Sequence, residues 1–260
     1  MALSLKNLLK VSASLPPRIL AYGEPGIGKT SFAAEFPDNI FLQIEDGTPG
    51  GLQLTSFGKL EKFAEVMEAI SALYSEEHSF KTLVVDSVTE LQRLVFAETC
   101  ERGDDKGTKQ SSIEGFGYGK GYVLAQRVWQ EFIDGINALR RDRGMTIILI
   151  AHSTIERFDD PESSSYHRYE IDLHSRSVGA IERDMDCIFL LKKSISTRKE
   201  DIGFAQSRAI AEGGSLTYIH TEGRPAFVAK NRYGLPAKLK FEKGKGFEAV
   251  AAFLPIHTHT

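Results

Sequence analysis

The sequence predicts an α/β fold, with a mostly parallel central sheet flanked by helices and an antiparallel extension at its C-terminal side. Short runs of apolar and β-branched residues, typical of strands buried on both faces, alternate with longer segments of helical apolar spacing. Beyond residue 206, strand-like runs follow one another with only turn residues between them, which is typical of antiparallel strands. The first pattern predicts the parallel part of the sheet and the second predicts its extension.

The composition is that of a folded globular protein, with 42% hydrophobic and 26% charged residues in 260. We expect one domain over residues 18–250, a lead-in segment at 1–17 and a short tail at 251–260. The net charge of −3 argues against a protein that coats nucleic acid with a wholly basic surface. The longest apolar run, Met145–Ala151, is too short to cross a bilayer, so we expect a cytoplasmic protein with no membrane partner.

The lead-in segment has leucines at amphipathic spacing and ends at the proline pair 16–17. It is expected to pack either on its own domain or on a neighbouring subunit.

The first predicted strand, Ile19–Tyr22, leads into a glycine-rich motif, because residues 23–30 match G-x-x-x-x-G-K-[ST]. In this phosphate-binding loop the glycines let the backbone curl so that successive N–H groups point at phosphate oxygens. The lysine reaches the β- and γ-phosphates, the threonine hydroxyl can ligate Mg²⁺, and a helix begins at the lysine. We therefore expect ATP and Mg²⁺ as cofactors. The residues expected to bind the nucleotide are Gly23, Glu24, Pro25, Gly26, Ile27, Gly28, Lys29, Thr30 and Ser31.

A second predicted strand, Ile40–Ile44, is followed by a loop to Gly58 and a helix over Leu60–Tyr74. A third predicted strand, Thr82–Asp86, ends in a single carboxylate, the pattern of a Walker B motif. Asp86 would then hold Mg²⁺ together with Thr30. The alternative is that Asp86 caps the helix predicted to begin near residue 88.

A fourth strand, Met145–Ala151, follows a long predicted helix over Tyr122–Arg143 and ends at His152. A polar residue at the end of a central strand beside the phosphate loop is well placed to contact the γ-phosphate, as donor or acceptor. The alternative is a hydrogen-bonded histidine at a strand edge with no role in the site.

Residues 101–121 form a long polar, glycine-rich connection, which in a compact domain is typically functional or disordered. Aromatic residues alternate there with basic ones, a pattern suited to stacking bases while following a phosphate backbone. The charge is nearly balanced, with five basic and four acidic residues from 101 to 127, and a mobile lid is the alternative. The residues expected to contact nucleic acid are Lys106, Lys109, Tyr118, Lys120 and Tyr122.

Residues 155–177 are predicted to form a second, acidic loop, followed by a fifth strand at 186–191. Strand-like runs at 207–211, 215–221 and 226–229 would build the antiparallel extension. Residues 224–245 hold seven basic residues against one acid, the most basic stretch of the chain.

The order of these motifs resembles the RecA/DnaB class of oligomeric motor ATPases. Within that class the chain is most similar to phage-encoded AAA/RecA-like ATPases associated with single-strand annealing and recombination. The similarity covers about residues 18–241, and its more specific parts are residues 117–122, 150–152 and 229–234. It implies a RecA-like P-loop NTPase fold.

The resemblance also implies roles for individual residues. Glu45 stands where the class places the glutamate that polarises the attacking water, with Asp46 as the competing choice. His152 stands where a polar residue, usually glutamine, couples the γ-phosphate to a DNA-binding loop. Lys230 and Arg232 match the basic pair that a neighbouring subunit inserts into the active site as arginine fingers.

The implied partners are further copies of the same chain in a ring or filament, single-stranded DNA, and a single-strand DNA-binding protein. The hypothesis is a DNA-dependent ATP hydrolase that assists phage recombination, annealing or replication in a bacterial cytoplasm. One alternative is an ATP-dependent loader that remodels a protein partner. Another is a nucleotide-gated switch with little turnover, against which Glu45 argues, because a switch does not need a carboxylate that activates water.

Overall fold

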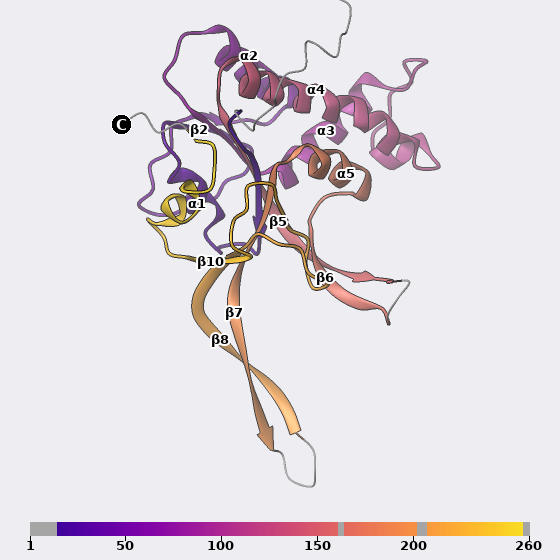
Figure 1. Ribbon diagram of the computed structural model, residues 1–260. Helices are drawn as coiled ribbons and strands as arrows, with labels where there is room; N and C mark the ends of the chain where they lie inside the picture. The colour runs from indigo at the N-terminus through magenta and orange to yellow at the C-terminus, as the bar shows by residue number, and fades with distance from the viewer. Residues whose placement is uncertain (1–14, 161–163, 202–206, 257–260) are drawn as a thin grey trace, which may run out of the picture.

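The computed structural model describes residues 15–160, 164–201 and 207–256 (Figure 1). The leucines that predict the amphipathic lead-in, Leu3, Leu5, Leu8 and Leu9, lie outside these residues. Among the helices that are described, none is long and apolar enough to cross a membrane.

Ten strands of the described chain form one sheet in the order β10-β8-β7-β1-β5-β4-β2-β3, with β6 paired to β5 and β9 paired to β7. All pairings among β1, β2, β3, β4, β5 and β7 are parallel, whereas β6, β8, β9 and β10 pair antiparallel. This confirms the predicted fold class, an α/β fold with a mostly parallel central sheet and an antiparallel extension. The strands are β1 Arg18–Gly23, β2 Asn39–Gln43, β3 Ser56–Lys59, β4 Thr82–Asp86, β5 Thr146–Phe158, β6 Tyr166–Ile171, β7 Cys187–Asp201, β8 Ser207–His220, β9 Lys230–Asn231 and β10 Lys238–Phe241.

Helices cover both faces of the sheet, because successive side chains of a strand point to opposite faces. In β1, Ile19 and Ala21 pack with α1 and α6, whereas Leu20 and Tyr22 pack with α2, α3, α4 and α5. Figure 1 shows α1 beside α6, away from the other helices. The helices are α1 Lys29–Ala34, α2 Phe63–Ser75, α3 Val88–Arg102, α4 Lys120–Asp142, α5 Ser175–Asp184 and α6 Gly246–Ala251, and the 3₁₀ helix η2 spans Ile113–Phe116.

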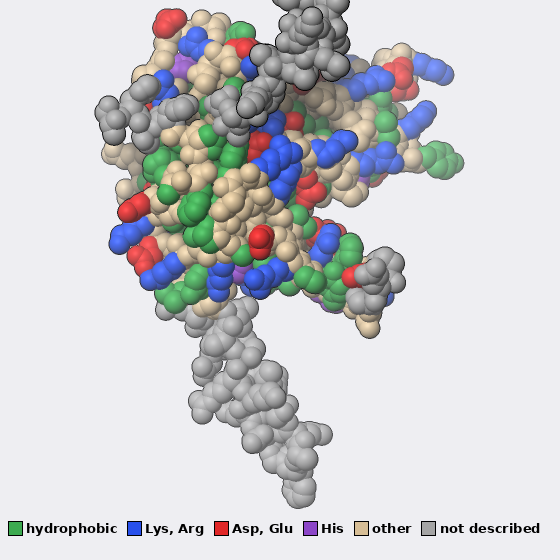
Figure 2. Space-filling model, in the orientation of Figure 1, with side chains coloured by type: hydrophobic (Ala, Val, Ile, Leu, Met, Phe, Trp, Pro, Cys, Tyr) green, Lys and Arg blue, Asp and Glu red, His purple; other side chains and the backbone are tan. Residues whose placement is uncertain are grey.

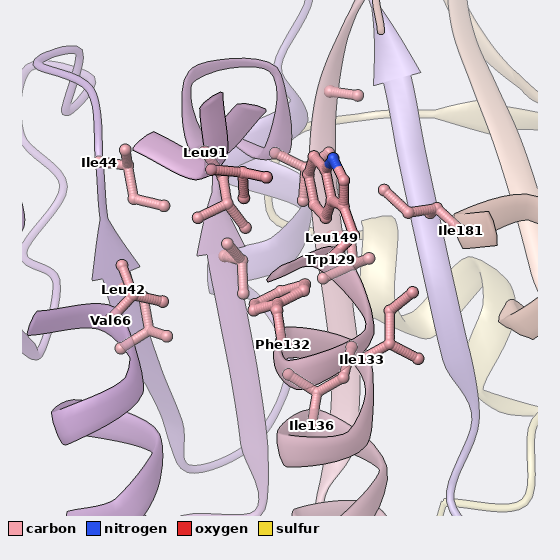
Figure 3. Close-up of a cluster of buried hydrophobic side chains, with 14 of the residues drawn as sticks. Leu42, Ile44, Val66, Leu91, Trp129, Phe132, Ile133, Ile136, Leu149 and Ile181 are labelled. Atoms are coloured by element: carbon pink, nitrogen blue, oxygen red, sulfur yellow. The ribbon is translucent and has the colours of Figure 1, made fainter. Parts of the chain in front are cut away.

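The larger hydrophobic core lies between the sheet and α4 (Figure 3). Trp129, Phe132 and Ile136 recur along α4 at helical spacing and are almost completely buried. Burial of each such side chain contributes about 2–3 kcal/mol to the free energy of folding. Val85 of β4 and Leu149 of β5 belong to the same core, close along their strands to Asp86 and His152 of the candidate site.

The predicted loop at 155–177 is wrong. The strand β5 continues past His152 to Phe158 and pairs antiparallel with β6, and α5 follows. This hairpin projects from the body of the protein (Figure 1), so its strands do not need an apolar face along their whole length. The apolar alternation by which a half-buried strand is recognised is therefore weak.

Three further details differ from the sequence prediction. The loop before α2 contains a short edge strand, β3, whose sequence Ser-Phe-Gly-Lys has little strand character. The strand-like runs predicted at 207–211 and 215–221 belong to one long strand, β8, which pairs with β7 along its length with one register shift, next to Gly213. The predicted strand at 226–229 is a turn with isolated bridges, and the paired residues are those of β9, Lys230–Asn231.

Candidate functional site: a phosphate loop and its carboxylates

The phosphate loop connects β1 to α1 at the C-terminal edge of the parallel sheet. Gly26 and Gly28 have φ of 74° and 110°, in the left-handed region that favours glycine. Gly28 has a second constraint, because a Cβ atom there would lie 2.9 Å from Cε1 of Phe241. The backbone of the loop therefore depends on glycine at these positions.

Lys29 is the first residue of α1 and is only 6% exposed. Its Nζ donates to the backbone carbonyls of Gly23 and Glu24 at 2.8 and 3.0 Å. Burial lowers the pKa of Lys29, whereas the charges of Asp86 and Glu45 oppose this shift. Within the described residues the hydrogen-bond partners of this ammonium are neutral carbonyls, which it can exchange for the oxygens of an anion.

Thr30 and Asp86 meet across the loop, since the Thr30 hydroxyl donates to Oδ2 of Asp86 at 2.8 Å. Asp86 ends β4, is 8% exposed, and has a pKa raised chiefly by burial. Its other oxygen, Oδ1, is buried without a hydrogen-bond partner among the described residues. A hydroxyl beside a carboxylate with a free oxygen is a donor set that suits Mg²⁺, so these two residues fit the expected metal. The alternative role of capping α3 belongs to Ser87, whose hydroxyl accepts from the Glu90 N–H.

Glu45 follows β2 and is anchored beside Asp86 by its backbone, because the N–H groups of Ile44 and Glu45 both donate to the Asp86 carbonyl. Its Oε2 lies 3.0 Å from Nε2 of His152 and accepts from the Ser87 hydroxyl at 3.0 Å. The hydrogen bond from His152 is the main cause that lowers the pKa of Glu45.

Asp46, the competing choice for the water-activating carboxylate, forms an ion pair with Lys59 at 2.5 Å, and its side chain is 82% exposed. Glu45 has the more restrained position of the two.

His152 lies where β5 leaves the sheet core and enters the hairpin. Its backbone N–H donates to the Thr89 hydroxyl, and its carbonyl accepts from the N–H of Asp172, just beyond β6. Its Nδ1 is buried without a partner among the described residues. His152 thus contacts Glu45 through its ring and the hairpin through its backbone.

These groups line one cavity of about 520 Å³. Of the nucleotide-binding residues expected from the sequence, Gly23, Glu24 and Ile27 are not part of its lining, and the buried Ile27 packs into the core instead. One lining residue, Lys243, was not singled out by the sequence reasoning, although it lies in the basic stretch noted there. The residues that line the cavity are Pro25, Gly26, Gly28, Lys29, Thr30, Ser31, Glu45, Asp46, Gly47, Pro49, Asp86, His152 and Lys243.

The basic pair Lys230 and Arg232 lies near the N-terminal ends of the parallel strands, whereas the phosphate loop of the same chain lies at their C-terminal ends. Lys230 donates to the Glu182 carbonyl at 2.8 Å, and Arg232 pairs with Asp186 at 3.0 Å. Asp186 directly precedes β7, whose first residue is paired with Ile19, four positions before Gly23. At about 3.3 Å per residue of strand, the basic pair and the phosphate loop are therefore separated by roughly 13 Å along the strand direction.

The residues expected to contact nucleic acid lie on the projection formed by α3, α4 and their connection. Tyr118 is fully exposed, whereas Tyr122 donates to Glu114 at 2.7 Å and stacks on His174 with ring centroids 3.8 Å apart. Lys109 is paired with Glu101. Lys106 and Lys120 form no ion pair within the described part of the chain. Figure 2 shows acidic side chains among the basic ones on this projection.

The chain matches the AAA domain over residues 15–233. It belongs to the AAA domain family. No curated protein matches this chain in sequence. Among solved structures, the RadB recombinase is similar at a TM-score of 0.46 and 12% identity, over 88% of this chain and 90% of the other.

Proposed function

We propose that this AAA-domain protein is an oligomeric, Mg²⁺-dependent ATPase that binds single-stranded DNA and assists phage recombination, annealing or replication. The observation that carries the ATPase part is the convergence in one cavity of Lys29, the Thr30–Asp86 pair and Glu45. These are the three components that nucleotide hydrolysis requires, namely a phosphate-binding cation, a metal-binding set and a carboxylate that can orient and activate water.

Each residue has a defined task in this proposal. Lys29 exchanges the two carbonyls that it now contacts for phosphate oxygens, and Thr30 and Asp86 hold Mg²⁺. The metal, when bound, neutralises charge on the phosphates. Glu45 accepts the proton of the attacking water, and Ser87 and His152 hold its carboxylate in place through the hydrogen bonds described above.

Oligomerisation is proposed because Lys230 and Arg232 lie at the opposite end of the sheet from the phosphate loop of their own chain. A finger role therefore requires the nucleotide of a neighbouring copy. In the single chain Arg232 is about half exposed, so it remains accessible to a neighbour despite its ion pair with Asp186.

DNA binding is proposed at the hairpin β5–β6 and the α3–α4 projection. His152 supports this placement, because it contacts Glu45 in the cavity and belongs to the strand that forms the hairpin. A single-strand DNA-binding protein is a further proposed partner.

A second function, ATP-dependent remodelling of a protein partner, is favoured by the charges of the projection. Lys109 pairs with Glu101, and Arg127 pairs with Asp105, so two of its cations are already neutralised. Such a surface attracts a phosphate backbone weakly.

The deciding experiment measures ATP hydrolysis with and without single-stranded DNA. Lys29→Ala is the inactive reference, and Lys81→Ala, an exposed lysine at the far end of β4 from Asp86, is the matched control. Stimulation by DNA that is lost only in Lys29→Ala supports the proposal. Turnover that DNA does not change supports remodelling, and nucleotide binding without turnover supports the nucleotide-gated switch.

A further inference from the structure

We propose that Lys243, on the connection between β10 and α6, is a ligand of the nucleotide's phosphates supplied by the same chain. The inference rests on the proposed nucleotide site and adds a residue to it from about 200 positions farther along the sequence.

Lys243 lies at the cavity because the segment that carries it is packed against the phosphate loop. Phe241 contacts Gly28 so closely that a Cβ atom there would lie 2.9 Å from the Phe241 ring and 3.7 Å from Cε of Lys243. Phe241 also packs edge-on against Phe32 of α1, with centroids 6.0 Å apart. Gly28 therefore has two tasks, since it permits the turn of the loop and admits this segment beside it.

A second contact fixes the segment on its other side. The carboxylate of Glu35, the residue directly after α1, accepts from the backbone N–H groups of Gly244, Gly246 and Phe247. These bonds occupy the N–H groups at the start of α6. The anion at the N-terminus of this helix is therefore the Glu35 carboxylate of the same chain. Phe36 and Phe247 add an aromatic contact with centroids 4.9 Å apart.

The charges nearby leave Lys243 available for an external anion. Lys240 and Lys245 both pair with Glu242, whereas no described carboxylate forms an ion pair with Lys243. A flexible ammonium that lines the same cavity as Lys29, on a segment anchored to α1, is suited to bind phosphate oxygens. Glu35 is then a positioning residue, because it holds the backbone that presents Lys243.

The test measures the Kd of MgADP, and of a non-hydrolysable MgATP analogue, by titration calorimetry. We expect Lys243→Ala to raise both values about tenfold, the size of one charge-assisted hydrogen bond, and Lys243→Arg to restore most of the loss. Lys245→Ala is the matched control, since this lysine is on the same connection but does not line the cavity. Equal binding by Lys243→Ala and Lys245→Ala would overturn the inference.

The role of Glu35 is tested by a double-mutant cycle. If Glu35 acts through Lys243, Glu35→Ala weakens nucleotide binding, and the double variant binds no more weakly than Lys243→Ala alone. If the two substitutions weaken nucleotide binding independently, so that their losses of binding free energy add, the positioning role is contradicted. This holds whether or not the melting temperature also changes.

The two proposals fail in different ways. If the wild type and Lys29→Ala both fail to bind nucleotide, the proposed function is wrong and this inference falls with it. If the wild type binds, Lys29→Ala does not, and Lys243→Ala binds like the wild type, only this inference is wrong.

Discussion

Oε2 of Glu45 and Nε2 of His152 lie 3.0 Å apart, although Glu45 follows β2, His152 lies within β5, and β4 runs between these strands in the sheet. The imidazole therefore reaches past the end of β4, where Asp86 lies, to contact the carboxylate. The contact orients Glu45 and lowers its pKa. It also joins the candidate catalytic carboxylate to the strand that forms the projecting hairpin.

We expect Glu45→Gln to reduce ATP turnover by about 10²–10⁴-fold, because an amide cannot accept the proton of the attacking water. Binding of MgADP should change little, since Glu45 is not the phosphate-binding cation. The matched variant is Asp46→Asn, which removes an exposed ion pair and should leave turnover near the wild-type value. Turnover that is lost in Asp46→Asn and kept in Glu45→Gln would reverse the two assignments.

The pH dependence of turnover should respond to His152. Glu45 must be deprotonated to act as a base, and its pKa is lowered mainly by the hydrogen bond from His152. As the pH falls, turnover is lost when Glu45 becomes protonated. His152→Ala removes the bond and should move this acid limb to higher pH, whatever its effect on the maximum rate. His152→Gln, which retains an N–H donor, should move it less, and an acid limb unchanged in both variants would contradict the coupling.

We expect Arg232→Ala to lower turnover by about a thousandfold, the effect of losing an arginine finger. Stability should change little, because Asp186 keeps its bonds to Arg18 and Arg140. Nucleotide binding and thermal unfolding of the variant check both statements.

Mixing inactive variants tests whether Arg232 acts between subunits. An interface that combines the intact phosphate loop of Arg232→Ala with the intact Arg232 of Lys29→Ala is complete, so the mixture should regain activity. A mixture of Lys29→Ala with Glu45→Gln is the control, because every chain in it has a defective site. No recovery in the first mixture would refute the finger role in trans.

His220 should make the protein less stable in mild acid. Burial, aided by the charges of Lys238, Lys192 and Arg224, lowers the pKa of His220 to about 4. The ordinary value is about 6.5, so the unfolded chain takes up this proton first, and stability falls as the pH drops from about 6.5 towards 4. His220→Gln should lose less stability than the wild type between pH 7 and pH 5, measured by urea unfolding. His167→Gln, at an exposed position of β6, is the control, and an equal loss in His220→Gln and the wild type would contradict this prediction.

The phosphate loop and the strands around it could be predicted because their signals are local. The strand at Thr82–Asp86 and the helix start at Lys29 were predicted at their observed residues. In each case neighbouring residues carry both the apolar pattern and the motif. The hairpin β5–β6 was missed because its polar residues lack the apolar alternation of a half-buried strand.

Amino-acid sequence by itself determined the fold class, the parallel sheet and the residues that form the phosphate loop, since strand and turn preferences act over a few residues. Tertiary structure alone decided that His152 reaches Glu45, that Arg232 pairs with Asp186, and that Lys243 lines the cavity. These contacts join residues that are 46 to more than 200 positions apart. They depend on the order of strands in the sheet and on the packing of α6 against α1, which no local pattern encodes.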